Sequence, residues 1–340
     1  MNLSDFDYIL PPELIAQYPG ENRSDSRMLV LRRKDGSIED RRFNELPDII
    51  DATYFLVVND SRVFKARLFA RRPTGGRVEI FLVRRQSGSA WQVFLRPSAK
   101  IKLGERLFFD GGDSVCVLDS PGTEERLIEF AAPHREAEII ERLGQVPLPP
   151  YIRRDVAAVD VDRYQTIYAD ETGSVAAPTA GLHFDLSILE RLRVRDIEME
   201  KVTLHVGPGT FKPVTAERIE DHVIEPESAV ISPAAAEKIN RHKEQGKKLL
   251  AVGTTSVRTL EAAAAEGRLR PYADLVGLYI YPPYRFRMVD ALLTNFHLPK
   301  TSLLMLAAAF CGRDFLMAAY RHAVEQKYRF YSYGDCMLIL

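Results

Sequence analysis

Residues 54–72 mark the point at which the chain changes from one architecture to another; they read YFLVVNDSRVFKARLFARR. Their first part, YFLVVND (54–60), is an apolar run that ends in polar residues, which is typical of a strand buried on both faces of a sheet. Their second part begins a series of short runs rich in Val, Phe, Leu and Ile. We therefore expect a sheet of an α/β domain up to about Arg62 and a different kind of domain from Val63.

That series predicts a small antiparallel β-barrel or sandwich. Strands spaced by about 8–12 residues, with Gly and Pro in the turns between them, are the pattern of such domains. The Pro-rich segment GQVPLPPYI (144–152) then provides a return path between domains. We expect an inserted, basic, all-β barrel domain over 63–150. Its strands are expected in VFKARLFARR, RVEIFLVRR, AWQVFLRP, RLFFD, SVCVLD and RLIEFA.

The segments on either side of the insert predict an α/β domain, because strands and helices alternate there. Continuous apolar runs indicate buried strands, and longer segments with helical periodicity indicate helices. The fold class expected is α/β, with a large, open barrel-like domain made discontinuously from 1–62 and 151–340. Buried strands are expected at 54–60, 248–253 and 273–281, and helices at 232–246 and 301–312.

The bulk composition is that of a soluble globular protein in a reducing compartment. Of the 340 residues, 46% are hydrophobic and 27% are charged. Cys116, Cys311 and Cys336 lie far apart without a C-x-x-C pair, which argues against a disulfide framework and a zinc knuckle. The first residues lack the features of a signal peptide, and no run approaches the roughly 18 apolar residues of a membrane helix. We expect a cytoplasmic protein that does not contact a membrane.

The net charge of −1 hides an uneven distribution. From Arg62 to Arg106 there are twelve Lys or Arg and two acids, Glu79 and Glu105, so this stretch carries +10 and the remainder −11. A basic segment on an acidic protein is the footprint of a polyanion-binding surface. A solvated strand face without acidic neighbours is the alternative, and we favour contact with nucleic acid.

Several familiar functional motifs are absent. HVGPGTFKP (205–213) contains G-x-G but lacks the third glycine of a dinucleotide fingerprint, and the sequence has no Walker A loop, H-E-x-x-H or G-x-S-x-G. His222, Glu225 and Glu227 are spaced like metal ligands, but no further ligand set accompanies them, so we expect no metal.

Polar residues follow the first buried strand, at the place where α/β proteins bind ligands. Asn59, Asp60, Ser61 and Arg62 form either a plain turn or a site in which Asp60 acts as a base or accepts a hydroxyl group.

The segment AVGTTSVRTLEAAA (251–264) leads from a strand into a helix in the same way. Its hydroxyl residues are explained as helix N-caps. Arg258 is not, because a cation in the first turn opposes the helix dipole. A bound carboxylate or phosphate would remove that cost and would accept the free N–H groups, so we expect an anion site here.

The segment LLTNFHLPKTSLLMLAAAF (292–310) contains a helix, expected to begin at Thr301 or Ser302, that is apolar enough to be buried on most sides. Its start then lies inside the protein, where unpaired His297 and Lys300 would be costly. Either these side chains reach solvent through a cleft or they meet a ligand, and we favour the ligand.

The segment GSVAAPTAGLHFD (173–185) is predicted to be a pocket wall with one reactive group. Its Gly and Ala residues let a ligand approach the backbone, and His183 is a candidate acid or base. His205, alone in a strand, is more often a satisfied core residue than a catalyst.

Taken together, these segments closely resemble the S-adenosylmethionine:tRNA ribosyltransferase-isomerases of the queuosine pathway. The matches follow in order over nearly the whole chain, and SVAAPTAGLHF with TNFHLPK is highly specific. One departure is that Ile224-Glu225-Pro226-Glu227 stands where the family usually has Met-His-Ser-Glu, so Glu227 is kept but a role for the histidine is in doubt. Other matching segments are DFDYILPPELIAQYP, VVNDSRVFKARL, TGGRVEIFLVRR, LRPS, VPLPPYI, RYQTIYA, VTLHVGPGTFKPV, AVGTTSVRTLEAA, YPPYRFRMVDALL and FYSYGDCMLIL.

The resemblance implies an α/β domain with an inserted β-barrel, and it implies a reaction. Such an enzyme transfers and isomerises the ribosyl part of S-adenosylmethionine onto 7-aminomethyl-7-deazaguanine at the wobble position of tRNA. The product is epoxyqueuosine, and adenine and methionine are released. S-adenosylmethionine is then a co-substrate and tRNA the partner; no prosthetic group or metal is expected, and the protein is expected to act as a monomer.

The implied chemistry needs groups that titrate near neutrality, because protons must leave C5′ and the attacking amine and must reach adenine. We expect one cavity between 173–185 and 292–302, without an assignment of which histidine is the base. The ribose hydroxyls are expected at Asp60 or Thr179, and the methionine carboxylate at Arg258 or Lys300. The catalytic candidates are His183, His205, His297, Asp60 and Glu227. The substrate-binding candidates are Arg62, Arg96, Ser98, Thr179, Gly181, Gly209, Thr210, Thr254, Thr255, Ser256, Arg258, Asn295 and Lys300. The tRNA-binding candidates are Arg71, Arg72, Arg84 and Arg85.

Two other functions remain open from the residues alone. An S-adenosylmethionine-dependent RNA methyltransferase is disfavoured by the missing glycine-rich loop. A non-catalytic RNA-binding protein would explain the basic insert but would leave Arg258, His297 and Lys300 without a purpose.

Overall fold

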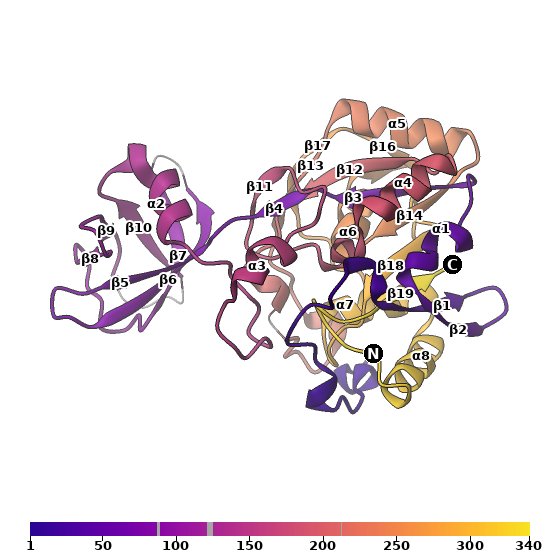
Figure 1. Ribbon diagram of the computed structural model, residues 1–340, viewed down its shortest axis with the longest axis horizontal. Coiled ribbons are helices and arrows are strands. Elements are labelled where there is room, and N and C mark those ends of the chain that lie inside the picture. The colour runs from indigo at the N-terminus through magenta and orange to yellow at the C-terminus, as the bar shows by residue number, and fades with distance from the viewer. Residues whose placement is uncertain (87–88, 121–124, 212) are drawn as a thin grey trace.

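The computed structural model describes residues 1–86, 89–120, 125–211 and 213–340, and it has two parts of unequal size (Figure 1). The smaller part, at the left of Figure 1, contains the strands β5 to β10 and the helix α2. The chain enters it after β4 (Ser61–Val63) and leaves it after α2 (Glu136–Leu143). The larger part is made by the segments before and after.

Six strands of the smaller part close into an antiparallel barrel within the described residues, in the order β10-β7-β6-β5-β8-β9. Alternate residues of β6, Val78, Ile80 and Leu82, are fully buried and fill the interior, as the period of a strand requires. The expected barrel is confirmed, and its strands all lie within 63–150, although the exact domain boundaries stay a prediction. The strands are β5 (Arg67–Arg71), β6 (Arg77–Arg85), β7 (Ala90–Arg96), β8 (Arg106–Phe108), β9 (Ser114–Val117) and β10 (Glu125–Phe130).

Nine described strands of the larger part form one sheet, in the order β17-β13-β12-β3-β14-β18-β19-β1-β2. The four central strands β12, β3, β14 and β18 run parallel to one another, and β13, β17, β19, β1 and β2 flank them. The bounds are β1 (Arg27–Arg32), β2 (Ser37–Arg42), β3 (Tyr54–Asn59), β12 (Met199–Leu204), β13 (Glu227–Ile231), β14 (Lys248–Val252), β17 (Tyr272–Val276), β18 (Ala291–Asn295) and β19 (Cys336–Ile339).

Helices cover both faces of this sheet, which is why β3 reads as a continuous apolar run. Phe55 and Val57 pack into the core under α5 to α8, whereas Leu56 and Val58 pack into the core under α1 and α4. The helices are α1 (Leu46–Ile49), α3 (Ala158–Arg163), α4 (Leu186–Val194), α5 (Pro233–Glu244), α6 (Thr254–Ala263), α7 (Ser302–Cys311) and α8 (Arg313–Glu325). Short strands β11 (Glu171–Ser174), β15 (Ala264–Ala265) and β16 (Arg268–Leu269) complete the part. The described 3₁₀ helices are Leu3–Phe6, Pro12–Leu14, Arg23–Asp25, Phe43–Glu45, Pro133–Arg135, Thr179–His183, Pro208–Phe211 and Ile219–Asp221.

One edge of the sheet collects the polar strand ends. The parallel strands β12, β3, β14 and β18 end there, and the antiparallel register places the first residues of β13 and β19 at the same edge. Because the barrel is inserted immediately after β3 and β4, it leaves the sheet from this edge. Ligands of open α/β sheets bind at such an edge.

Two local expectations are wrong. The buried strand expected over 273–281 is only β17 (Tyr272–Val276), and Ala273, Asp274 and Leu275 are exposed because β17 is the edge strand of the sheet. The N-cap of α6 is Gly253, with φ of +88°, so the hydroxyl residues that follow are not the cap. The start of α7 at Ser302, with Thr301 as N-cap, is confirmed.

No single described helix is long and apolar enough to cross a membrane. The pair α7 and α8, bent by 115°, passes that test together on length and composition alone.

Candidate functional site

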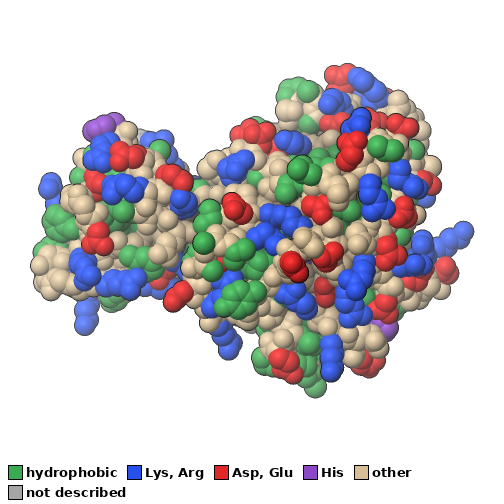
Figure 2. All heavy atoms as spheres, in the orientation of Figure 1, with side chains coloured by type: hydrophobic (Ala, Val, Ile, Leu, Met, Phe, Trp, Pro, Cys, Tyr) green, Lys and Arg blue, Asp and Glu red, His purple; other side chains and the backbone are tan. Residues whose placement is uncertain are grey.

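A cleft of about 1000 Å³ lies between the barrel and the polar edge of the large sheet. Figure 2 shows the surface indented where the two parts meet. The barrel side supplies Phe64, Val83, Trp91 and side chains of α2, and the sheet side supplies residues of β11, residues that follow β12 and the start of β13. We call this the interdomain cleft. The lining residues used below are Phe64, Lys65, Arg84, Arg85, Trp91, Gly173, His205, Gly207, Gly209, Glu225 and Glu227.

His205 is the histidine of the interdomain cleft. It directly follows β12, and its ring lies against the backbone of Gly173, where a Cβ would come within 2.7 Å of Cε1 and Nδ1. Burial lowers its pKa, so the imidazole is neutral at pH 7. Its buried Nδ1 has no hydrogen-bond partner among the described residues. A neutral imidazole in the lining of a cleft is suited to accept a proton.

Glu227 lies at the floor of the same cleft and is fully engaged by protein groups. The N–H of Gly207 and the hydroxyl of Thr210 donate to Oε1 over 2.8 and 2.9 Å, and Arg258 donates to Oε2. Arg258 also donates to the carbonyls of Val276 and Leu278 at 3.0 and 3.2 Å. The anion expected beside Arg258 is therefore present as a side chain of the chain itself.

Asp60 is buried behind His205, at the end of β3. Its carboxylate accepts a hydrogen bond of 2.7 Å from the hydroxyl of Thr203, and burial raises its pKa. The neighbouring Asn59 links the ends of β3 and β12 to the start of α6, because its amide donates to the carbonyl of Leu204 and to Thr255 Oγ1. Asp60 and His205 interact electrostatically, so the structure brings these two candidates together.

His183 lies elsewhere, at the bottom of a second pocket of about 270 Å³ that shares no lining residue with the interdomain cleft. The amide nitrogen of Asn295 lies 3.2 Å from Nε2, and Ser26 Oγ lies 2.7 Å from Nδ1. The Asn295 amide also faces the carbonyls of Tyr331 and Asp335, so it donates to Nε2 and leaves the proton on Nδ1. Burial, assisted by Arg23 and Arg329, lowers the pKa of His183 to about 4.

His297 and Lys300 have partners within the chain. Thr294 Oγ1 lies 2.8 Å from Nε2 of His297, and the backbone N–H of His297 donates to the hydroxyl of Tyr320 at 2.9 Å. Burial lowers the pKa of His297 to about 3. Lys300 is half-exposed and forms an ion pair of 2.6 Å with Asp7. The argument that both would be unpaired without a ligand is therefore wrong, and the structure does not bring the three histidines into one cavity.

The tRNA-binding candidates of the barrel divide into two groups. Arg84 and Arg85 line the interdomain cleft, near Gln92 and Glu136. Arg71 and Arg72 lie toward the opposite end of β6, where Arg71 pairs with Arg77. At about 3.4 Å per residue along the strand, that end is about 27 Å from Arg85. The guanidinium of Arg72 is held by both carboxylate oxygens of Glu105, at 2.6 and 3.0 Å.

The remaining candidates lie at several places. Gly209 and Thr210 line a small pocket of about 70 Å³ next to the interdomain cleft, with Glu225, Glu227 and Arg258. Of the others, Arg62 is exposed and donates to the carbonyl of Ala169, Gly181 packs against Tyr168, and Ser256 donates to the carbonyl of Val252. The substrate-binding candidates outside the lining of the interdomain cleft are Arg62, Arg96, Ser98, Thr179, Gly181, Thr210, Thr254, Thr255, Ser256, Arg258, Asn295 and Lys300.

The sequence interpretation missed the aromatic wall of the cleft. Phe64 and Trp91 have ring centroids 5.8 Å apart, and the buried Nε1 of Trp91 has no acceptor among the described residues. Trp91 is the only tryptophan of the chain, which is the one signal that could have drawn attention to it.

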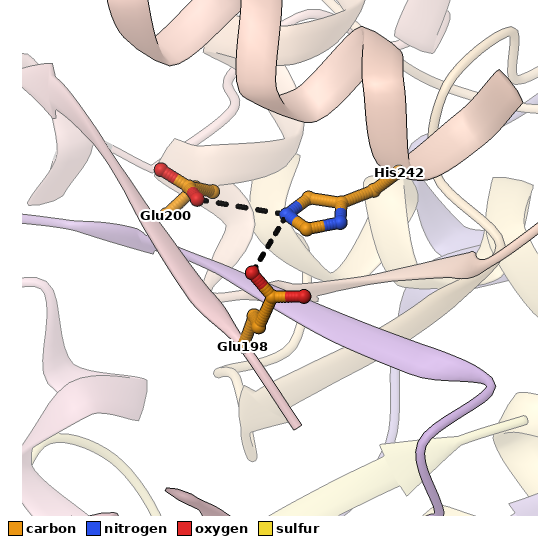
Figure 3. A group of neighbouring side chains, drawn as sticks. All are labelled: Glu198, Glu200 and His242. Atoms are coloured by element: carbon orange, nitrogen blue, oxygen red, sulfur yellow. Dashed lines mark ion pairs between the residues drawn. The ribbon is translucent and has the colours of Figure 1, made fainter. Parts of the chain in front are cut away.

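A cluster that could hold a metal ion lies at another place, formed by Glu198, Glu200 and His242 (Figure 3). Nε2 of His242 points between the two carboxylates, at 3.6 and 3.5 Å. Lys247 lies 2.9 Å from Glu198 and Lys238 lies 3.6 Å from Glu200, so cations of the chain already balance the acids. We interpret this cluster as an ion-pair network on the sheet. His222, Glu225 and Glu227 form no such cluster among the described residues.

The chain is similar to known proteins over its full length. Residues 3–339 match a family model described as queuosine biosynthesis protein. Curated proteins named S-adenosylmethionine:tRNA ribosyltransferase-isomerase match over 100% of both chains, with 49% identity in Symbiobacterium thermophilum and 46% in Thermotoga maritima. A crystal structure of S-adenosylmethionine tRNA ribosyltransferase from Thermotoga maritima aligns with a TM-score of 0.58 and 38% identity, covering 99% of this chain and 100% of that one.

Proposed function

The chain belongs to the queuosine biosynthesis protein family, and on that premise we propose that it transfers and isomerises the ribosyl part of S-adenosylmethionine onto tRNA. The acceptor is 7-aminomethyl-7-deazaguanine at the wobble position, the product is epoxyqueuosine, and adenine and methionine leave. The reaction takes place in the interdomain cleft. The observation that carries this location is His205, a neutral imidazole in the lining of the cleft, held between the polar sheet edge and the aromatic barrel wall.

The charge of the cleft suits cationic reactants. Apart from Glu227, which Arg258 balances, its lining includes the acids Glu125, Glu136, Glu141 and Glu225, against the cations Lys65, Arg84 and Arg85. The sulfonium of S-adenosylmethionine and the protonated aminomethyl group of the acceptor both carry positive charge, and an acidic cleft concentrates them.

His205 acts as the base that removes a proton from C5′, which the neighbouring sulfonium acidifies. A base must be unprotonated before it reacts, and the lowered pKa of His205 keeps it so down to slightly acidic pH. Asp60 lies behind it, so a carboxylate supports the imidazolium that forms.

Glu227 and Arg258 act as positioning residues. Their ion pair fixes the turn Gly207–Thr210, because Glu227 accepts from both ends of that turn. The turn follows His205 directly, so the pair holds the backbone on which the proposed base sits.

The barrel wall receives the target base. A wobble base must leave the anticodon stack to enter an active site, and aromatic side chains replace the lost stacking. Phe64 and Trp91 offer such faces opposite His205. We expect the protein to work as a cytoplasmic monomer on this tRNA.

The reaction is tested by incubating the protein with ribose-labelled S-adenosylmethionine and tRNA that carries 7-aminomethyl-7-deazaguanine. We expect the label in the tRNA, with adenine and methionine released in equal amounts. Formation of S-adenosylhomocysteine would show methyl transfer instead, and binding without any turnover would leave an RNA-binding protein.

The role of His205 is tested with His205→Asn. We expect turnover to fall by roughly 10²- to 10⁴-fold, the usual contribution of a general base. In the wild type, kcat/KM should fall on the acid side only below the ordinary histidine pKa, since burial lowers that of His205. His222→Asn, at the rim of the small pocket, is the matched control and should keep the wild-type acid limb. An acid limb that persists in any residual activity of His205→Asn would exclude His205 as the base.

A further inference from the structure

The second pocket, of about 270 Å³ with His183 at its bottom, is strongly basic. Six cationic side chains line it, against the acids Asp25 and Asp335. We call it the basic pocket. Its cations are Arg23, Arg27, Arg42, Arg163, Lys327 and Arg329.

Backbone carbonyls, which carry no net charge, hold most of these cations in place. Arg23 donates to the carbonyls of Leu182 and Asp162 at 3.2 and 2.7 Å, and Arg163 donates to that of Glu21 at 3.0 Å. Arg42 donates to the carbonyl of Asp25 at 3.3 Å, and Arg329 to that of Tyr18. The guanidinium groups are thus oriented without losing their charge.

Few carboxylates form ion pairs with these cations. Among the ion pairs within the described residues, Arg27 with Asp40 at 3.2 Å is the one that involves a cation of the basic pocket. The carboxylate of Asp335 is occupied by the backbone N–H groups of Arg27 and Arg329, at 2.8 and 2.7 Å.

The cations also repel one another. Burial is the main cause that lowers the pKa of Arg23, and the charge of Arg163 lowers it further. The buried Nε of Arg163 has no hydrogen-bond partner among the described residues. An anion between them would relieve this repulsion and supply the missing acceptor. Guanidinium groups match the oxygens of phosphate in charge and geometry.

The basic pocket opens at the same sheet edge as the interdomain cleft. Ser26 and Asp335 precede β1 and β19, whereas His205 follows β12, and β19 and β1 lie four and five positions from β12 in the sheet. At about 4.8 Å per strand the two sites are roughly 19 to 24 Å apart. A large folded RNA can reach both at once. Figure 2 shows Lys and Arg side chains gathered near the centre of this face, where α3 lies in Figure 1.

We propose that the basic pocket binds a backbone phosphate of the tRNA whose base enters the interdomain cleft. This deepens the proposed function and depends on tRNA being the substrate. The phosphate is bound by the oriented guanidinium groups, and contact with two separated points of the RNA fixes its direction across the sheet edge. The basic barrel segment then need not supply all of the RNA affinity.

The test compares the double variant Arg42→Gln/Lys327→Gln, two exposed cations of the pocket, with Arg193→Gln/Arg268→Gln. The control removes the same charge from exposed positions of the large part, outside the pocket. Dissociation constants for a tRNA transcript are measured from 50 to 200 mM salt. We expect the pocket variant to bind roughly ten-fold more weakly at low salt, with a log–log salt slope smaller by about 1 to 2. The control should match the wild type. Fluorescence of Trp91, measured with S-adenosylmethionine alone, should show the same nucleotide affinity in all three proteins.

The outcomes separate the possible failures. If wild-type protein binds tRNA and transfers the ribosyl group, but the pocket variant keeps the wild-type slope, the assignment of the pocket fails and the function stands. Equal losses in pocket and control variants would also overturn it, because the effect would be one of net charge. Calorimetry can also show that the wild type binds inorganic phosphate and the pocket variant does not. If the tRNA affinity of the pocket variant is unchanged at the same time, the pocket is reassigned to a small anion. Wild-type protein that does not bind tRNA would overturn the proposed function as well.

Discussion

Gly173 and His205 form the contact on which the proposed active site depends most directly. They come from β11 and from the end of β12, and the imidazole lies where any side chain at position 173 would be. Glycine is needed here for space, because a Cβ would lie 2.7 Å from two ring atoms. The residue type at 173 therefore controls the orientation of a ring 32 positions later.

Gly173→Ala should displace the His205 ring and reduce turnover by about 10²-fold, because a misplacement of about 1 Å at a catalytic group has an effect of that size. Steady-state kinetics with substrate tRNA provide the measurement. Gly207→Ala is the matched control, since its Cβ would make ordinary contact with Glu227 at 3.8 Å. A Gly173→Ala enzyme as active as this control would show that the ring position does not matter.

The buried histidines make the stability of the protein depend on pH. His297, with a pKa of about 3, stays neutral in the folded chain at pH values where an unfolded histidine binds a proton. Between pH 6.5 and 4 the unfolded state therefore binds more protons, and stability falls as the pH falls.

His297→Gln should reduce by one the number of extra protons that the unfolded state binds relative to the folded state. Between pH 6 and 4.5 the slope of the free energy of unfolding against pH should decrease by about 1.4 kcal/mol per unit relative to wild type. Urea denaturation at a series of pH values gives both slopes. His322→Gln, at a partly exposed histidine, is the control for the substitution itself, and equal slopes in His297→Gln and wild type would contradict the buried neutral state.

At the scale of elements, the ion pair of Glu227 and Arg258 joins the start of β13 to the first turns of α6. Both side chains are buried, with exposed fractions of 5% and 6%, so each needs the other as a counter-charge. The pair also explains why an arginine is tolerated near the positive end of a helix.

Arg258→Met should destabilise the protein by about 3 kcal/mol, because it leaves the carboxylate of Glu227 buried with two neutral donors. Adding Glu227→Gln should recover part of that loss. Chemical denaturation of the wild type, both single variants and the double variant forms a double-mutant cycle. Strictly additive effects would mean that the two side chains do not interact.

At the scale of the whole molecule, the insertion of the barrel after β4 sets which basic residues can meet a ligand in the cleft. Arg84 and Arg85 reach the cleft, whereas Arg71 and Arg72 lie at the far end of the same hairpin. The charge of the segment is therefore divided between two surfaces.

Arg84→Gln/Arg85→Gln should weaken tRNA binding and reduce the log–log salt slope by about 1 to 2, because each lost phosphate contact releases one counterion fewer. Arg71→Gln/Arg72→Gln carries the same charge change and should have a smaller effect, since Arg72 is already paired with Glu105. Filter binding from 50 to 200 mM salt decides between them. A larger effect of the second pair would move the RNA to the outer end of the barrel.

Local patterns in the sequence were sufficient for the architecture. The six barrel strands follow from short apolar runs between turns, and the α/β domain follows from the buried runs at β3 and β14 and from the helices α5 and α7, because these signals depend on neighbouring residues. They were insufficient for β17, whose exposure follows from its place at the edge of the sheet.

The sequence by itself also determined which residue types gather at strand ends, and hence Asp60 and His205 as candidates, whereas Glu227 became a candidate through the resemblance. Only the tertiary structure decided that His205 lies in the interdomain cleft while His183 lies in the basic pocket, hydrogen-bonded to Asn295, which is 112 residues away in sequence. It likewise paired Glu227 with Arg258 and Lys300 with Asp7. The physical reason is that strand order and the point of insertion decide which strand ends become neighbours, and neither leaves a mark in any short stretch of the chain.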